Sequence, residues 1–396
     1  MEGRSCCVKN KFVLLADMFV NMGIGLIMPI TTLFVHNSLG KSLVVAGYVL
    51  LGFSGAMTLG NLAGGRMFDA WNQKATMYTG GGLVVGALCL LAAFPVWPLY
   101  PILLAFYGFG LGILNSAVNG YLAFLQKSDA NIFNNGYWFA NIGMAISTLL
   151  AGYLFDINIR LIFGLAALLF TTTVVLIRLK FQDFSVKQTA PQLTQGSHKE
   201  FSNLLAIFLV CLIMITIWIC YEQWNSNVSV LMTDMGISVR KYSMLFTIST
   251  VEILVLQPIL TRLFSNTFRS DKMRVVLGVI FFACSYLTIA SAQLYWQFVL
   301  GITFVSVGEI LALTAIPILL NRYATDRDRG TIQSLGSLSG SLGRALGPLS
   351  GGWLITMLGY DKTFIVFFGA HLLLLVLLAF IRRPAGASQV TNEQKG

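Results

Sequence analysis

Four carboxylates lie inside apolar runs that are long enough to cross a membrane: Asp17, Glu222, Glu252 and Glu309. A charged side chain near the centre of a bilayer costs about 2.5–3.5 kcal/mol, so an embedded acid usually faces a cavity or a partner. A carboxyl group in such a place can bind and release a proton as its surroundings alternate between wet and closed, and its charged form can attract a cation. We therefore predict that these acids bind and release protons as part of the protein's function. The simpler alternative is an uncharged acid that hydrogen-bonds a neighbouring helix.

Polar and aromatic residues share helical faces with some of these acids, because side chains three or four positions apart lie together on a helix. Trp218 and Asn225, for example, lie one turn before and after Glu222. An aromatic face stabilises a bound cation by about 0.5–2 kcal/mol. Polar stripes line either a water-filled cavity or a contact between helices. The predicted substrate cavity comprises Asn21, Asn115, Asn119, Tyr137, Trp138, Asn141, Trp218, Trp224, Asn225 and Arg344.

Arg344 is the one base inside an apolar run, within the stretch GSLGRALGPLSGG at 340–352. An embedded arginine needs a counter-charge or carbonyl partners. An embedded acid could serve, but the sequence does not say which one. The glycines and Pro348 predict close helix packing and a possible bend.

The composition is that of a polytopic membrane protein. Of the 396 residues, 56% are hydrophobic and 11% are charged, and the mean hydropathy is +0.76. A soluble domain carries about 25% charged residues. Of the six cysteines, four lie in apolar runs and none has metal-ligand spacing, so we expect neither a disulfide framework nor a metal site. No phosphate-binding GxxxxGK[ST] motif and no nucleophile–base arrangement is visible, so we expect no enzyme and no cofactor.

Spans need about 20 apolar residues each, and we predict twelve of them. They cover residues 12–36, 43–67, 76–95, 98–125, 132–155, 159–178, 203–231, 239–264, 272–292, 295–320, 331–357 and 362–381. A polar stretch separates the sixth from the seventh. The predicted domains are an N-terminal six-helix bundle at 1–179, a cytoplasmic linker at 180–202, and a C-terminal six-helix bundle with a tail at 203–396.

The distribution of basic residues predicts the orientation. If both termini lie in the cytoplasm, 20 of the 26 Lys and Arg residues fall on the inner side and five in outer loops, with Arg344 inside a span. Cytoplasmic loops of membrane proteins accumulate Lys and Arg, so we expect both termini to be cytoplasmic. This bias explains most of the net charge of +10, so we expect no nucleic-acid partner. The expected partners are protons, a small-molecule substrate and the lipid bilayer, and the expected state is a monomer.

A charged turn lies between the second and third predicted spans, with Gly65, Arg66, Asp69 and Lys74. Charges at a cytoplasmic helix end can form an ion-pair latch, although an exposed pair contributes only about 0–1 kcal/mol. We predict a gating loop here. The alternative is a solvated turn.

The chain resembles the major facilitator superfamily. Gly65-x-x-x-Asp69 and Lys74 look like that family's loop between helices two and three. The sequence GIGLIMP at 23–29 is similar to the first helix of drug/proton antiporters. Gly308-Glu309-Ile310, with Arg329-Gly330 beyond it, looks like the tenth helix and following loop of LmrP-type multidrug antiporters, and Tyr137-Trp138 with Asn141 looks like their fifth helix. The resemblance implies that Glu222 and Glu309 handle protons and cations.

A repeat within the chain agrees with this resemblance, because parallel six-helix repeats build the transporters of that family. Glycines recur at a spacing of 200 residues, in the pairs Gly108 and Gly308, Gly136 and Gly336, Gly143 and Gly343, and Gly152 and Gly352.

Three features depart from the antiporter pattern. The basic residue that many antiporters carry in helix four is absent from the stretch Leu103–Phe106, and Ile146-Ser147 stands in the region of their Gly-Pro pair. A Gly347-Pro348 pair occurs in the eleventh span instead. Glu222-Gln223 and Gly308-Glu309 also resemble helices seven and ten of peptide/proton symporters, whose ExxER signature in helix one is missing here.

We therefore predict an all-α membrane protein with twelve transmembrane helices in two pseudo-symmetric six-helix bundles, located in the cell membrane. The predicted function is proton-coupled export of amphipathic or cationic compounds by alternating access. The alternative is proton-coupled uptake of a peptide or small metabolite.

Overall fold

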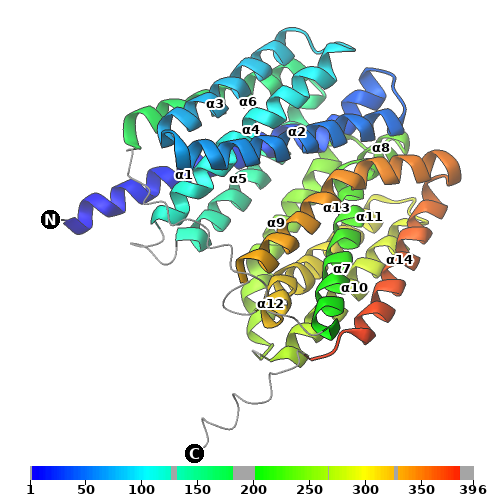
Figure 1. Cartoon of the computed structure of the whole chain (residues 1–396). Helices are drawn as coiled ribbons and strands as arrows, with labels where there is room; N and C mark the ends of the chain where they lie inside the picture. The colour runs from blue at the N-terminus through cyan, green and yellow to red at the C-terminus, as the bar shows by residue number, and fades with distance from the viewer. Residues whose placement is uncertain (1, 126–131, 182–200, 266, 325–328, 384–396) are drawn as a thin grey trace, which may run out of the picture. The chain divides into compact units, whose positions relative to one another are not determined.

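The structure is a computed structural model that describes residues 2–125, 132–181, 201–265, 267–324 and 329–383. Every regular element in these ranges is a helix. A helix satisfies its own backbone N–H and C=O groups, which is what a chain inside hydrocarbon requires. The all-helical class predicted from the sequence is therefore confirmed (Figure 1).

The helices follow one another along the chain. The first half of the chain contains α1 (Glu2–Leu33), the π-helical turn η1 (Phe34–Ser38), α2 (Leu43–Ala70), α3 (Gln73–Ala93), α4 (Leu99–Leu125), α5 (Ile132–Phe155) and α6 (Ile159–Lys180). The second half contains α7 (Phe201–Asn225), α8 (Asn227–Asp234), α9 (Val239–Arg262), α10 (Phe268–Ile289), α11 (Tyr295–Gly308), the π-helical turn η2 (Glu309–Leu313), α12 (Thr314–Arg322), α13 (Arg329–Leu358) and α14 (Tyr360–Phe380).

Among the described residues, eleven helices or continuous helix runs are long and apolar enough to cross a membrane. The runs α7–α8 and α11–η2–α12 each count as one span, as the sequence predicted. The difference from twelve lies in α13, which is long enough but falls short in hydropathy. Its sequence explains this, because glycine and serine repeat along it and Arg344 lies near its middle.

Two compact units can be distinguished within the chain. One comprises Met1–Thr189 with Trp224–Thr250, and the other comprises Ala190–Gln223 with Val251–Gly396. The last two residues of α7, together with α8 and the first half of α9, thus group with α1–α6. The predicted bundles at 1–179 and 203–396 stay a prediction, and most of the predicted linker, residues 182–200, lies outside the described residues.

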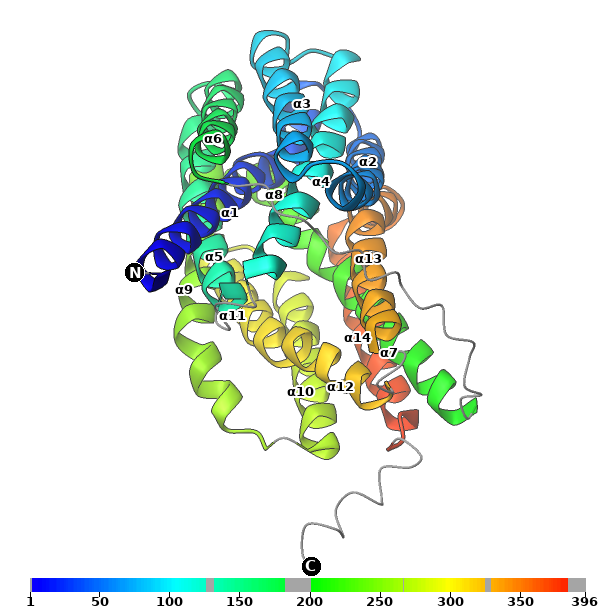
Figure 2. The same ribbon diagram turned by 60° about the vertical axis from the view of Figure 1, so that its left-hand side comes forward.

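The first unit is held together by close helix pairs. Helix α2 packs along α4, α1 along α5, and α3 against α4 and α6 (Figures 1 and 2). Glycine permits the α2–α4 approach, because a Cβ at Gly64 would lie 2.7 Å from the Cα of Ile113. Small residues at such crossings let backbones meet, which is how helices gain packing energy inside a bilayer.

In the second unit, α10 lies at the centre of the packing. It contacts α11, η2, α12 and α14 (Figure 2). Gly278 on α10 allows this, since a Cβ there would lie 2.7 Å from the backbone nitrogen of Ala312 and 2.9 Å from the carbonyl of Gly308. The turn that carries Glu309 is therefore held directly against the α10 backbone.

Prolines account for two local features of the helices. Pro317 has no N–H to donate to the carbonyl of Leu313, and η2 ends at Leu313. Pro29 similarly frees the carbonyl of Gly25, which accepts a hydrogen bond from Thr148 Oγ1 of α5 at 3.4 Å. Single π-helical turns are rare and often mark functional sites.

Candidate functional site

Two embedded residues of the second unit, Glu222 and Arg344, lie where α13 packs on α7. Glycines of α13 lie close to α7. A Cβ added at Gly343 would lie 2.6 Å from Trp218 Cβ, and a Cβ added at Gly347 would lie 2.6 Å from Glu222 Cβ. The Gln223 amide donates to the carbonyl of Gly347 at 2.8 Å and fixes the register of the two helices. The close packing that the sequence predicted for this glycine-rich stretch is confirmed.

This packing gives Arg344 two partners on α7. Its guanidinium carbon lies 4.2 Å from the centroid of the Trp218 ring. Glu222, one turn along the same helix, lies close enough to attract the guanidinium electrostatically. The acid that compensates Arg344 is therefore Glu222, a pairing that the sequence left open. Arg344 remains exposed although it is engaged in this way.

Glu309 occupies the first position of the η2 turn and meets α7 through a different residue. The Tyr221 hydroxyl donates a hydrogen bond to the Glu309 carboxyl group. The other carboxyl oxygen, Oε2, is buried and has no hydrogen-bond partner among the described residues. Protonation of a carboxylate adds a donor at such an oxygen, so the two protonation states of Glu309 differ in the bonds they can make.

A third acid of this unit, Glu252, joins α9 to α11. Thr303 Oγ1 donates to Glu252 Oε1 at 2.7 Å. The second oxygen of Glu252 is buried and has no partner in the described part of the chain. Thr303 lies on the helix that leads to Glu309, so both acids depend on the position of α11.

Asp17 belongs to the first unit and is 7% exposed. Asn21 Nδ2 donates to its Oδ1 at 3.2 Å and to its backbone carbonyl at 2.9 Å. A Cβ at Gly136 of α5 would lie 3.4 Å from Asp17 Oδ2, so the carboxyl group sits against the α5 backbone. Asp17 and Asn21, one turn apart on α1, are therefore hydrogen-bonded to each other.

The other predicted cavity residues have varied surroundings. Asn119 Nδ2 donates to Asn115 Oδ1 at 3.3 Å on α4. Trp138 is 37% exposed, whereas Trp224 is 1% exposed and packed within the protein. Asn141 is partly buried on α5 and Asn225 is partly buried at the end of α7. The Tyr137 side chain lies outside the described residues. The roles of these residues stay predictions.

The predicted gating loop joins α2 to α3. Arg66 and Asp69 are exposed, Lys74 is partly buried, and no described residue forms an ion pair with Asp69. Asn72 caps α3, because its side chain accepts a hydrogen bond from Ala75 N at 2.8 Å.

A partly buried ion pair in the second unit was missed by the sequence analysis. Asp271 Oδ2 on α10 lies 2.6 Å from Arg322 Nε at the end of α12. Arg274, one turn further along α10, donates to Thr314 Oγ1 at 2.5 Å, and Thr314 donates to the carbonyl of Ile310 inside η2. Two hydrogen bonds thus connect η2 to Arg274, which lies one turn from this ion pair on α10.

The arrangement can perform reversible proton binding and charge exchange. Inside these apolar helices, the charge of Glu222 is balanced by Arg344. Glu309 accepts a hydrogen bond from Tyr221, and Glu252 accepts one from Thr303. Among the described residues, no group of His, Cys, Asp or Glu could hold a metal ion. The fold and this set of embedded charges define a multi-pass membrane protein that moves solutes.

The chain belongs to the Major Facilitator Superfamily. The model of that family matches residues 13–224 and 204–396, which together span nearly the whole chain. The protein is accordingly a membrane transporter and not an enzyme.

Two curated relatives agree with this assignment. The chain is 29% identical over 353 residues to the uncharacterized MFS-type transporter YttB of Bacillus subtilis (strain 168), which covers 88% of each chain. It is 22% identical over 351 residues to the multidrug resistance protein MdtH of Cronobacter sakazakii (strain ATCC BAA-894), with coverage of 87% and 85%.

Solved structures show the same fold at low sequence identity. A POT family transporter in complex with 5-aminolevulinic acid has a TM-score of 0.77 at 15% identity, and the match covers 95% of each chain. The nucleoside transporter NupG has a TM-score of 0.78 at 12% identity, covering 94% of this chain and 100% of that one. At such identities the likeness concerns the fold alone.

Proposed function

We propose that this transporter exports amphipathic or cationic compounds in exchange for protons, by alternating access and as a monomer. The observation that carries the proposal is the placing of neighbouring residues of α7 against two other helices: Tyr221 bonds Glu309, and Glu222 faces Arg344. A proton that moves on or off either acid changes the bonds that α7 makes. In the charged state Glu222 and Glu309, with the ring of Trp218, would attract a cation. Two further observations support export: the similarity to MdtH, which is described as a multidrug resistance protein, and the motifs that resemble LmrP-type multidrug antiporters.

The test is dye transport in inside-out vesicles under an imposed pH gradient. With the vesicle interior acidic, we expect ethidium to accumulate and a protonophore to release it. Cells that express the protein should accumulate less dye than cells that do not. If expression leaves dye accumulation unchanged and a labelled di- or tripeptide enters faster in acid medium, the export proposal is wrong.

A second candidate function is proton-coupled uptake of a peptide or small metabolite. Arg344 favours it, because a substrate carboxylate needs a fixed base and Arg344 is exposed while embedded in α13. Peptide transporters of the POT family also appear among the solved structures of the same fold. Binding of a carboxylate to Arg344 would have to compete with Glu222.

Arg344→Gln distinguishes the two candidates. In an exporter, Arg344 acts through charge balance with Glu222, so the variant should change the rate of dye transport without making peptides compete with the dye. In an uptake system, the same change should raise the KM for a dipeptide while a substrate without a carboxylate is affected less. Competition between labelled dye and unlabelled dipeptide, measured in wild type and variant, gives the answer.

We further propose twelve spans, with α13 as the eleventh along the chain. Its 30 residues measure about 45 Å, which exceeds the roughly 30 Å of the hydrocarbon core. Its low hydropathy follows from glycines that pack against α7 rather than face lipid. The bias in basic residues supports cytoplasmic termini and a location in the cell membrane.

Cysteine labelling in intact cells tests this orientation. In a background without native cysteines, Gln188→Cys should stay unlabelled by an impermeant maleimide until the cells are opened. Ser38→Cys, in the exposed turn before α2, is the matched position on the outside and should label in intact cells. Efficient labelling at position 188 in intact cells would reverse the orientation.

The loop from Gly65 to Lys74 is proposed to bias the conformation rather than bind substrate. Asp69 is exposed at the end of α2, where a charge can hold the inner side shut in one state. Asp69→Asn should therefore lower the maximal rate more than it changes the KM for the dye. A large change in KM at an unchanged maximal rate would assign Asp69 to the substrate site instead.

A further inference from the structure

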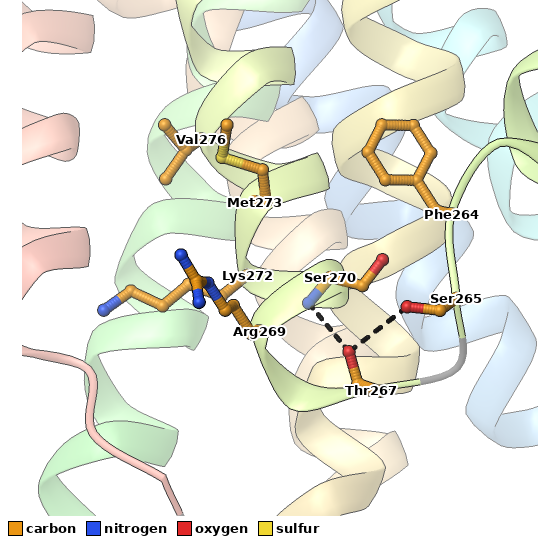
Figure 3. A pocket seen from close by; sticks show the side chains of 8 residues that line it. All are labelled: Phe264, Ser265, Thr267, Arg269, Ser270, Lys272, Met273 and Val276. Carbon is orange, nitrogen blue, oxygen red and sulfur yellow. Dashed lines mark hydrogen bonds between the residues drawn. The ribbon is translucent and has the colours of Figure 1, made fainter.

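A pocket of about 450 Å³ lies at the turn between α9 and α10, apart from the cluster of embedded acids (Figure 3). This volume is within the range of about 300–1,000 Å³ that small-molecule sites usually have. Both flanking helices are among the eleven candidate spans, so the turn between them lies at a membrane boundary. A ligand of this pocket would therefore meet both water and hydrocarbon.

One part of the pocket wall is basic and hydrogen-bonding. Arg269 and Lys272, in the first turns of α10, both line it, together with the Ser270 hydroxyl. Thr267 caps the helix by accepting a hydrogen bond from Ser270 N at 3.2 Å, so the N-terminal end of the α10 dipole faces the same region. Each of these features favours an anion.

The charges around the pocket do not cancel. Arg269 is exposed and pairs with no carboxylate among the described residues. Lys272 Nζ donates one hydrogen bond, to the Ile381 carbonyl at 2.8 Å, and an ammonium group has two further donors. The nearest acid on α10, Asp271, is already paired with Arg322, and the buried Arg274 lies 5.9 Å from the ring of Phe264, adding positive charge behind the wall.

The rest of the wall is apolar. Phe264, Met273 and Val276 line the pocket, and Met273 is 49% exposed. A soluble anion such as phosphate gains nothing from these side chains. An acyl chain attached to a phosphate would cover them while the phosphate faces Arg269 and Lys272.

We propose that this pocket binds the phosphate headgroup of an anionic phospholipid. Basic residues at the cytoplasmic boundary attract anionic lipids, and basic pockets between helices there bind their headgroups. The proposed cytoplasmic orientation puts this turn in the leaflet that carries such lipids. The bound lipid would also tie the start of α10 to the end of α14, because Lys272 holds the Ile381 carbonyl. The proposal holds whichever substrate is transported.

The test is lipid binding by the purified full-length protein in detergent, followed by native mass spectrometry and by thermal unfolding. The probes are dioleoylphosphatidylglycerol, dioleoylphosphatidylcholine and soluble glycerol phosphate. We expect binding and thermal stabilisation by phosphatidylglycerol, and little of either from the other two. If glycerol phosphate binds as well as the lipid does, the site takes a soluble anion. If phosphatidylcholine binds equally well, the bases do not select the headgroup. Either result overturns the proposal.

Variants locate the binding at this pocket. Each base near a membrane surface contributes about fivefold to the affinity for anionic lipid, so Arg269→Gln with Lys272→Gln should weaken phosphatidylglycerol binding about thirtyfold. The matched control is Arg178→Gln with Lys180→Gln, which removes two exposed bases at the end of α6 and should change it less than about twofold. Exchange of the two bases, Arg269→Lys with Lys272→Arg, should retain binding.

If the double variant does not fold, the single variant Arg269→Gln can be used to measure lipid binding instead. We expect it to fold, because Arg269 is exposed and has no ion-pair partner in the described part of the chain. It should weaken binding about fivefold. An equal loss in the α6 control would mean that the lipid responds to overall charge rather than to this pocket.

Discussion

Replacing Glu309 by glutamine is expected to abolish transport driven by a proton gradient, down to the level of vesicles without the protein. Glutamine keeps the size of the side chain and can still accept the hydrogen bond from Tyr221, but it cannot bind and release a proton. Exchange of substrate at equal pH on both sides should continue, because that process moves no net protons. The two assays together separate proton coupling from a failure to bind substrate.

The matched control for this variant is Asp361→Asn, an acid-to-amide change at an exposed position at the start of α14. It should leave both assays at the wild-type level. Thermal unfolding of each variant checks that the protein is folded. A Glu309→Gln protein that accumulates dye against a gradient at the wild-type rate would exclude Glu309 from proton coupling and leave Glu222 or Glu252 as candidates.

The helices of this chain could be predicted from the sequence because apolar runs of membrane length have few alternatives to helix. Each of the twelve predicted spans coincides with a helix or a continuous helix run. The predicted span at 331–357 coincides with α13, although the hydropathy of this helix is lower than that of the eleven candidate spans. The embedded acids were visible because an acid stands out in an apolar run.

The partners of those acids could not be predicted, because they depend on which helices meet. Tyr221 precedes Glu222, so it lies on a different face of α7 and reaches Glu309 from there. Nothing in the local sequence indicates this contact. Pro317 indicates an irregularity in the helix near η2, but a proline is compatible with several kinds of local distortion, so the π-helical turn itself could not be predicted. The sequence analysis did not single out Asp271, and only the approach of α12 reveals that it is buried.

The glycines of α13 lead to the second large effect, which concerns stability as well as transport. Alanine at position 347 should destabilise the protein, because its Cβ would lie 2.6 Å from Glu222 Cβ and 3.0 Å from the Ile219 carbonyl. Helix α13 would have to move away from α7, at a cost of about 1–3 kcal/mol for an overpacked contact. The same movement would separate Arg344 from Trp218 and Glu222 and lower the transport rate.

Gly369→Ala on α14 is the matched control, and the two variants should change stability in opposite directions. A Cβ at Gly369 would meet nothing within 4 Å. Alanine is favoured over glycine inside a helix by about 1 kcal/mol, so this variant should be as stable as the wild type or more so. Thermal unfolding in the same detergent measures both. If Gly347→Ala unfolds at or above the wild-type temperature and transports normally, α13 does not pack on α7 as closely as the structure has it, and the pairing of Arg344 with Glu222 loses its support.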